Sequence, residues 1–181
     1  MNYRSFINGL SAWLCVALLA GCQKWEDKTP PPIDLTKRYC NVPVAINYNH
    51  NFPGIEDNSV CIFPSGPYVG EYAFVDSVFY PDVDTATLFP LVNFNVSSRN
   101  DTQVYVNNFC SGGQQLAFST NRYYRAISDS VIAPGKQLMC RSLDTLSGTM
   151  EYRPADSSIY LEFTVVSDTG ITTHRGRAYK K

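Results

Sequence analysis

The segment SIYLEFTVV, residues 158–166, decides the fold of this chain because its side chains alternate strictly in character. Successive side chains of a β-strand point to opposite faces of the sheet, so such alternation is typical of a half-buried strand. The apolar set is Ile159, Leu161, Phe163 and Val165, and the other set is Tyr160, Glu162 and Thr164. The segment therefore predicts an antiparallel strand with one face on a core.

Seven more segments share this enrichment in β-branched and aromatic residues. They are 70–80, 88–97, 102–109, 115–120, 124–133, 143–152 and 171–179. Turn formers separate them, and no stretch has a helical period with caps. About eight short strands predict an all-β domain over residues 68–181, a single antiparallel up-and-down β-barrel, with a β-sandwich as the alternative. Closure is favoured because it removes exposed strand edges.

The first residues have the layout of a secretory signal. Arg4 is the only early charge, and an apolar run from Leu10 to Ala20 precedes small residues. As a helix this run spans about 16 Å, against a hydrocarbon core of about 30 Å. A transmembrane anchor is therefore the poorer interpretation.

The tetrapeptide LAGC, residues 19–22, resembles the bacterial lipobox, in which the cysteine is lipidated before the signal is removed. The resemblance implies that residues 1–21 are cleaved off and that acyl chains on Cys22 anchor the protein to a membrane. An ordinary secretory signal is the alternative. QKWED, residues 23–27, is similar to the Gln-Lys-acidic sorting signal of Bacteroidetes lipoproteins, interrupted by Trp25. It implies the outer membrane and favours the cell surface; the alternative is a charged tether start.

Residues 22–39 are expected to form the lipidated cysteine and an extended tether, because Pro30-Pro31-Pro32 cannot continue a helix. After removal of the signal, 14 basic and 16 acidic side chains remain, a formal balance near −2. That balance suggests no nucleic-acid partner. The membrane contact that we predict is the N-terminal lipid.

The cysteine count fits an oxidising compartment. Cys15 leaves with the signal and Cys22 takes the lipid, which leaves an even number of cysteines: Cys40, Cys61, Cys110 and Cys140. Four cysteines allow three pairings. A zinc site is the alternative, but the chain has no C-x-x-C pair and only two histidines, so neither a metal nor a cofactor is expected.

Residues 40–64 are rich in Asn, Pro and Asp and read as a turn-dominated segment. They resemble a short repeat of secreted Bacteroidetes proteins, C-x-x-P-x-A-x-N-Y-N followed by D-x-S-C. The matching residues are Cys40, Pro43, Ala45, Asn47, Tyr48, Asn49, Asp57, Ser59, Cys61 and Pro64. The resemblance implies a disulfide-stapled spacer, and together with chain proximity it favours Cys40–Cys61, which leaves Cys110–Cys140. Calcium at Glu56 and Asp57 is a weaker alternative to turn capping.

Four stretches from residue 68 onward form a further pattern: YVGEY (68–72), VYVNNF (104–109), VIAPGKQ (131–137) and LSGTM (146–150). In order and spacing they are similar to the lipocalin-like β-barrel lipoproteins of Bacteroidetes. The resemblance implies a lipocalin-like barrel. The family's cysteine after the first strand is absent here, so its disulfide pattern does not carry over.

No catalytic arrangement stands out from the sequence. There is no G-x-S-x-G elbow, and His50 and His174 read as surface residues. Asp82 and Asp84 read first as turn residues and not as a glycosidase pair. We therefore expect a non-enzymatic binding or scaffolding module for a surface glycan, a protein or a small ligand. A lipocalin-like carrier of a small apolar ligand is the alternative, and a glycan-processing enzyme is a distant third.

A last pattern is Asp followed by Ser or Thr and then an apolar residue. It resembles the O-glycosylation acceptor of Bacteroidetes envelope proteins, and the acceptor hydroxyls would be Ser77, Thr85, Ser130 and Thr145. The alternative is that these are ordinary turn and strand-end residues.

Overall fold

The computed structural model describes residues 32–49, 53–83, 86–109, 115–129, 137–138 and 144–181. The chain divides into Met1–Ile33 and Asp34–Lys181, and the account below concerns the second unit. Several predicted features lie outside the described residues: the signal and the lipidated cysteine, Cys110, Cys140, Thr85, Ser130 and His50. Within the described ranges, no helix is long and apolar enough to cross a membrane.

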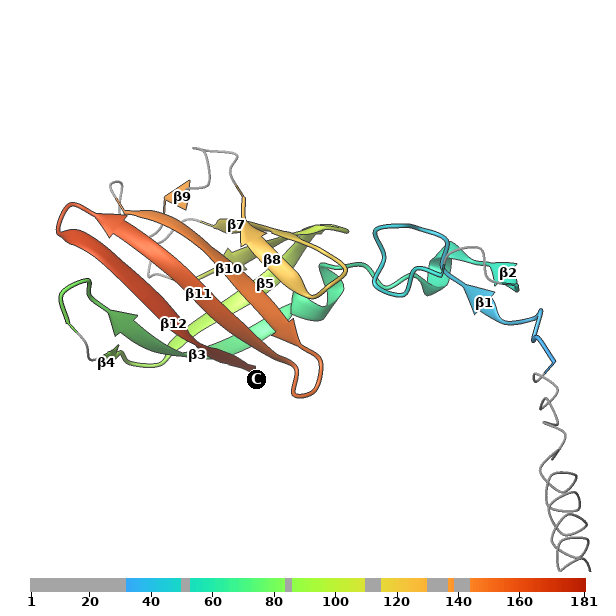
Figure 1. The fold of residues 1–181 in the computed structure, drawn as a ribbon, viewed down its shortest axis with the longest axis horizontal. Helices are drawn as coiled ribbons and strands as arrows, with labels where there is room; N and C mark the ends of the chain where they lie inside the picture. The colour runs from blue at the N-terminus through green and yellow to red at the C-terminus, as the bar shows by residue number, and fades with distance from the viewer. Residues whose placement is uncertain (1–31, 50–52, 84–85, 110–114, 130–136, 139–143) are drawn as a thin grey trace, which may run out of the picture. The chain divides into compact units, whose positions relative to one another are not determined.

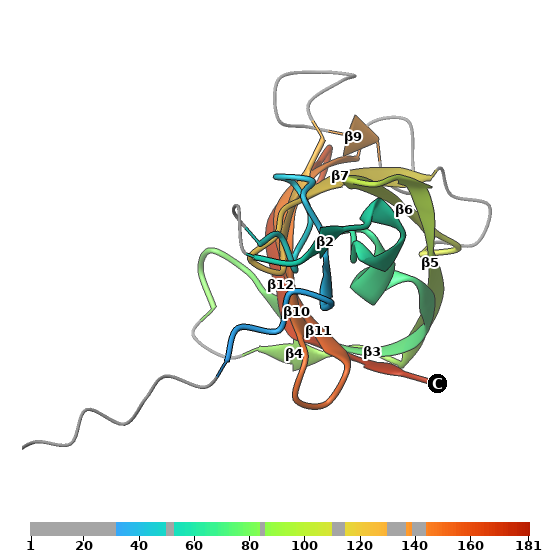
Figure 2. The ribbon, with the colours of Figure 1, turned by 90° about the vertical axis from the view of Figure 1, so that its right-hand side faces the viewer.

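Eight antiparallel strands close into an up-and-down β-barrel, as predicted, and the β-sandwich alternative is wrong (Figures 1 and 2). The strands are β3 (Gly70–Phe79), β5 (Val92–Asn100), β6 (Gln103–Asn107), β7 (Leu116–Thr120), β8 (Arg125–Ser128), β10 (Thr145–Arg153), β11 (Ser158–Ser167) and β12 (Gly170–Lys180). Each pairs with the next, and β12 pairs with β3 to complete the ring. Two short strands lie outside the ring: β4 (Thr87–Leu88) beside β3, and β9 (Gln137–Leu138) beside β10.

For two of the strands that start later than the sequence predicted, the local backbone gives the reason. The expected strand 88–97 is split, with β4 ending at Leu88 and β5 starting at Val92, because Pro90 has no N–H to give to a ladder. The expected strand 124–133 starts at Arg125, because Tyr124 has a left-handed φ of 61° that a strand does not allow.

The core lies inside the barrel and follows the predicted alternation. In β11 the buried side chains are Ile159, Leu161, Phe163 and Val165, the four apolar positions of the segment SIYLEFTVV, together with Ser158. The 3-10 helix η2 (Gly66–Tyr68) closes one end, where the fully buried Tyr68 donates a hydrogen bond to the carbonyl oxygen of Tyr124 at 2.5 Å. We call this the Tyr68 end of the barrel.

The segment before the barrel is short of regular structure, as predicted. It has a two-residue parallel pair, β1 (Arg38–Tyr39) with β2 (Ile55–Glu56), and the 3-10 helix η1 (Asn58–Val60). The expected disulfide joins Cys40 and Cys61. The side chain of Asn47 bridges the segment, because its amide donates to the Val60 carbonyl at 2.7 Å and accepts from the Ile62 N–H at 2.8 Å.

The carboxylate of Asp57 is already engaged by protein groups. It accepts from the Ser59 N–H at 2.9 Å and from the Arg38 guanidinium at 2.6 Å. The bonds from Ser59 and then from Arg38 lower the pKa of Asp57. Across the described ranges, no three His, Cys, Asp or Glu side chains are grouped to hold a metal ion. Asp57 caps η1, as the turn-capping interpretation expected, whereas Glu56 is exposed at the end of β2.

Candidate functional site

An aromatic layer crosses the middle of the barrel. Phe74 from β3, Phe94 from β5 and Phe163 from β11 meet around Phe109, which follows β6. The ring centroids are 5.5 to 6.5 Å apart, a normal spacing for packed aromatic pairs. The four rings pack on one another inside the barrel and occupy interior volume at that level.

A buried polar trio lies on the far side of this layer from the Tyr68 end. Nδ1 of His174 is 2.8 Å from Oδ2 of Asp76, and Nε2 of His174 is 3.1 Å from the hydroxyl oxygen of Thr172. The Phe163 ring stacks on the imidazole with centroids 4.6 Å apart and planes 7° apart. The imidazole is thus held between two hydrogen bonds and a flat apolar surface. We call this end of the barrel the Thr172 end.

The ladder that closes the barrel explains why these residues meet. Asp76 is on the first strand and His174 on the last, and β3 pairs with β12 in the register Asp76↔Gly176 and Val78↔His174. The inward positions of β3 are otherwise apolar, so the carboxylate of Asp76 enters a core face with only 8% of its side chain exposed. A buried charge of this kind needs a partner, and the imidazole supplies it.

One oxygen of this carboxylate is left over. Oδ1 of Asp76 is buried and has no hydrogen-bond partner among the described residues, whereas Oδ2 is bound by His174. Most buried polar atoms in proteins are hydrogen-bonded, so an unpaired one needs an explanation such as a binding role. The trio therefore has unused hydrogen-bonding capacity.

A pocket of about 350 Å³ opens next to the trio. It lies between residues 80–83, which follow β3, and residues 169–172, at the hairpin between β11 and β12. We call it the mouth pocket. Thr172 belongs both to the pocket wall and to the trio. The pocket is thus connected to the buried carboxylate through two hydrogen bonds.

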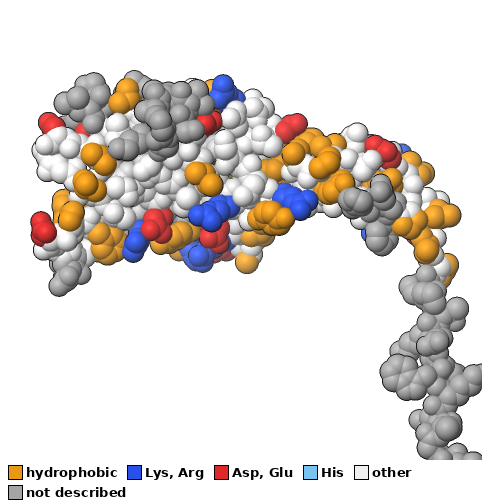
Figure 3. All heavy atoms as spheres, turned by 45° about the horizontal axis from the view of Figure 1, so that its top comes forward, with side chains coloured by type: hydrophobic (Ala, Val, Ile, Leu, Met, Phe, Trp, Pro, Cys, Tyr) orange, Lys and Arg blue, Asp and Glu red, His pale blue; other side chains and the backbone are white. Residues whose placement is uncertain are grey.

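The surroundings of the mouth pocket are apolar. Several exposed hydrophobic side chains lie at this end: Tyr80, Val83, Leu88, Phe89, Leu91 and Ile171. In Figure 3 hydrophobic side chains are grouped at the left end of the barrel, the end that carries the β11–β12 hairpin in Figure 1. A group of exposed hydrophobic side chains on a protein surface commonly marks a binding site.

The order Thr172, His174, Asp76 is that of a nucleophile, a base and an orienting group. Acyl-transfer catalysis also needs hydrogen-bond donors aimed at the reacting oxygen. Thr172 lies inside the β11–β12 ladder, opposite Val165, and no helix begins beside it in the described chain. The three side chains form a hydrogen-bonded chain that starts at the pocket wall.

The prediction that His174 is a surface residue is wrong. Its side chain is only 17% exposed, because it occupies an inward position of β12 and packs on Phe163. Asp82 lies in a turn, as predicted. Sequence reasoning missed the trio, although one signal was present: Asp76 interrupts the apolar inward face formed by Tyr72, Phe74 and Val78.

Two of the predicted glycosylation hydroxyls are in described strands. Ser77 is on the outward face of β3, opposite Leu88 and Arg175, and is partly exposed. Its preceding Asp76 points inward to His174 and is inaccessible in the folded barrel. Thr145 is the first residue of β10 and is partly exposed. Glycosylation of these residues stays a prediction.

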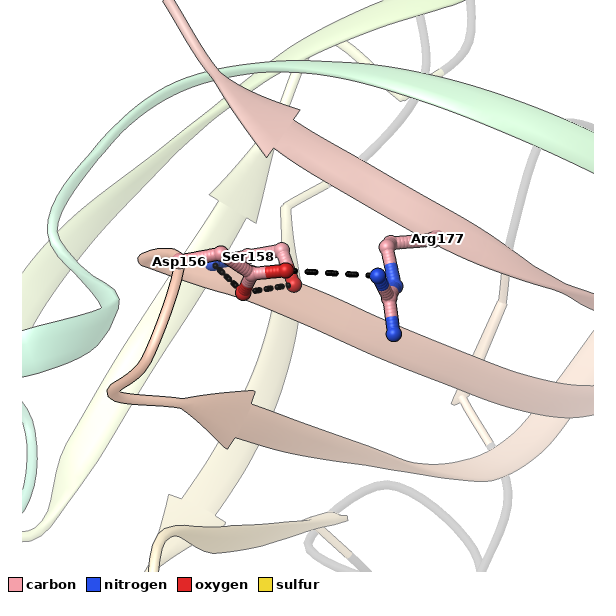
Figure 4. A network of polar contacts seen from close by, with 3 residues as sticks. All are labelled: Asp156, Ser158 and Arg177. Carbon is pink, nitrogen blue, oxygen red and sulfur yellow. Dashed lines mark hydrogen bonds and ion pairs between the residues drawn. The ribbon is translucent and has the colours of Figure 1, made fainter.

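A second polar network lies where the turn between β10 and β11 meets β11 and β12 (Figure 4). The carboxylate of Asp156 accepts from the Ser158 hydroxyl at 2.6 Å and the Ser158 N–H at 3.1 Å, and it faces the Arg177 guanidinium at 3.2 Å. The Ser158 bonds, and then the charge of Arg177, lower the pKa of Asp156. These groups satisfy each other, so the network is structural.

Comparison of the chain with protein-family models, with curated proteins and with solved structures found no match.

Proposed function

We propose that this protein is a lipid-anchored, non-enzymatic binding module of the bacterial outer membrane, exposed at the cell surface. The observation that supports binding is a closed barrel with an aromatic layer across its middle and an apolar pocket with a polar wall at one end. Support for the anchor comes from the lipobox-like residues before Cys22 and the sorting signal after it.

A small ligand held at the mouth pocket fits this geometry better than a long apolar ligand running through the barrel. Carriers of the second kind need a continuous apolar cavity, and here four phenylalanine rings cross the interior. The lipocalin-like carrier remains the second candidate, because an eight-stranded barrel has the right size for one small ligand.

Anchoring is tested by expressing the full precursor and its Cys22→Ser variant in a host that processes lipoproteins. We expect the native protein in the outer-membrane fraction with an intact mass that includes acyl chains on Cys22, and the variant released or retained as a precursor. Accessibility to protease on whole cells tests the surface location. An unmodified residue 22 in membrane-bound protein would overturn the anchoring.

Binding is tested by native mass spectrometry of protein purified from its own cells. We expect a small molecule that stays bound at low activation energy and raises the unfolding temperature when added back. Absence of any ligand, with no stabilisation by extracts of the native envelope, would contradict the binding function. Turnover of an envelope glycan by the purified protein would contradict the non-enzymatic assignment.

A further inference from the structure

We propose that the mouth pocket binds a primary amine with an apolar body, and that Asp82 and Thr172 receive its ammonium group. This inference rests on the proposed binding function and adds the chemical class of the ligand. Three features of the pocket lead to it: the sign of the charge on its wall, the direction of the hydrogen bonds through the trio, and the apolar side chains around it.

The charge on the pocket wall is negative. Asp82 is an exposed carboxylate in the wall, and none of the described wall residues is Lys, Arg or His. The cation Arg175 lines a neighbouring pocket that shares Tyr80 and Pro81, but its guanidinium is 3.0 Å from Glu162. A carboxylate ligand would meet repulsion from Asp82 and no compensating cation, whereas an ammonium group would meet an opposite charge.

The geometry of the trio allows Thr172 to act as a hydrogen-bond acceptor for the pocket. When the imidazole is neutral and its Nδ1–H donates to Asp76, Nε2 of His174 carries a lone pair and accepts from the Thr172 hydroxyl. The hydroxyl proton of Thr172 is then used, and only its lone pairs remain for a ligand. The unpaired Oδ1 of Asp76 adds negative potential behind this wall. An ammonium group has three donors and no acceptor, which matches such a wall.

The other side chains around the pocket fit a hydrocarbon body. Tyr80 is 41% exposed, Val83 48% and Ile171 50%, so apolar surface is available beside the acceptors. A cation near the face of an aromatic ring gains further attraction, which Tyr80 offers. The volume of about 350 Å³ is at the small end for ligand pockets. It therefore suits an amine of about ten heavy atoms or fewer.

The test compares three probes of similar shape that differ in head group: 2-phenylethylamine, 2-phenylethanol and phenylacetate. Affinities are measured by calorimetry with the mature full-length protein in a non-ionic detergent, and amide shifts in NMR spectra locate the site. We expect the amine to bind about tenfold more tightly than the alcohol, because charge-assisted hydrogen bonds are stronger than neutral ones. The carboxylate should bind more weakly than the alcohol.

Variants separate the proposed contacts from general surface charge. Asp82→Asn should lower the preference for amine over alcohol to about twofold, and Thr172→Val should weaken amine binding while it preserves side-chain shape. Asp101→Asn is the matched control, because Asp101 is an exposed aspartate in the turn between β5 and β6, at the Tyr68 end. It removes the same charge and should leave the preference unchanged.

Four results with the probes would overturn the inference: no amine binding, equal affinity for amine and alcohol, an Asp82→Asn variant with unchanged preference, or amide shifts away from residues 80–83 and 169–172. A neutral or acidic molecule found at the site in native protein would likewise overturn it, yet leave the binding function intact. If no molecule of any kind binds, both the amine inference and the proposed binding function fail. The two failures are therefore distinguishable.

Discussion

Gly176 allows the closing ladder of the barrel to form, and its replacement by alanine should be strongly destabilising. A Cβ atom built on Gly176 would lie 1.9 Å from the carbonyl oxygen of Val75 and 2.8 Å from Cε2 of Phe74. The Phe74 ring can turn a little, but the Val75 carbonyl belongs to the backbone of β3. That backbone is fixed by the antiparallel register from Thr173↔Phe79 to Lys180↔Tyr72.

The magnitude follows from the kind of atom that must move. Overpacking in a core costs about 1–3 kcal/mol, and displacement of a paired backbone places Gly176→Ala near the upper end, at about 3 kcal/mol. For a domain of this size the midpoint of thermal unfolding should fall by roughly 6–12 °C. Urea unfolding followed by circular dichroism, with the disulfide intact, gives the free energy of unfolding directly.

Gly66→Ala is the matched control, since the Cβ of an alanine at Gly66 would have no atom within 4 Å. Its free energy of unfolding should be unchanged or raised by about 0.5 kcal/mol, through a smaller entropy of the unfolded chain. A Gly176→Ala protein within about 0.5 kcal/mol of the wild type would refute the close approach of β3 and β12. So would equal losses in the two variants.

Three further predictions concern groups outside the mouth pocket. Ser158→Ala should return the pKa of Asp156 toward its ordinary value in an NMR titration. Because the pKa is lowered in the wild type, Asp156 stabilises the fold at pH values above the ordinary aspartate pKa. This stabilisation is lost as the pH falls through the lowered pKa. Tyr68→Phe should cost about 1 kcal/mol of unfolding free energy, because the carbonyl of Tyr124 loses one of its two donors and keeps only the Tyr152 N–H at 2.9 Å; an unchanged urea midpoint would contradict this. Asn47→Ala should speed amide hydrogen exchange between Cys40 and Cys61 and leave exchange in the barrel strands unchanged, and uniform acceleration would show that the bridge stabilises more than its own segment.

Strand positions could be predicted because each strand of this barrel has one face on the core. The alternation in residues 158–166 reappears as the buried set of β11, and all eight expected strands are present. The later starts at Pro90 and Tyr124 depend on the local backbone. The disulfide Cys40–Cys61 could be predicted for another reason, because the two cysteines are only 21 positions apart and close a local loop.

The candidate site could not be predicted in the same way, because its residues come from opposite ends of the domain. Asp76 and His174 are 98 positions apart, and only the register of β3 with β12 brings them together. A shift of that register by one residue would turn His174 to the outside. Alternation places Asp76 on an inward face, but it does not say which strand lies beside it.

Closure of the barrel and assembly of the site depend on the same few ladder pairs. Gly176 faces Asp76 across the closing ladder, and its missing side chain lets the Phe74 ring lie against β12 beneath the trio. The next inward residue of β12, His174, then stacks on Phe163 and reaches Asp76. A change that loosens β3 from β12 should therefore weaken ligand binding at the mouth pocket as well as stability. Changes at the Tyr68 end should lower stability alone, since the aromatic layer separates that end from the trio.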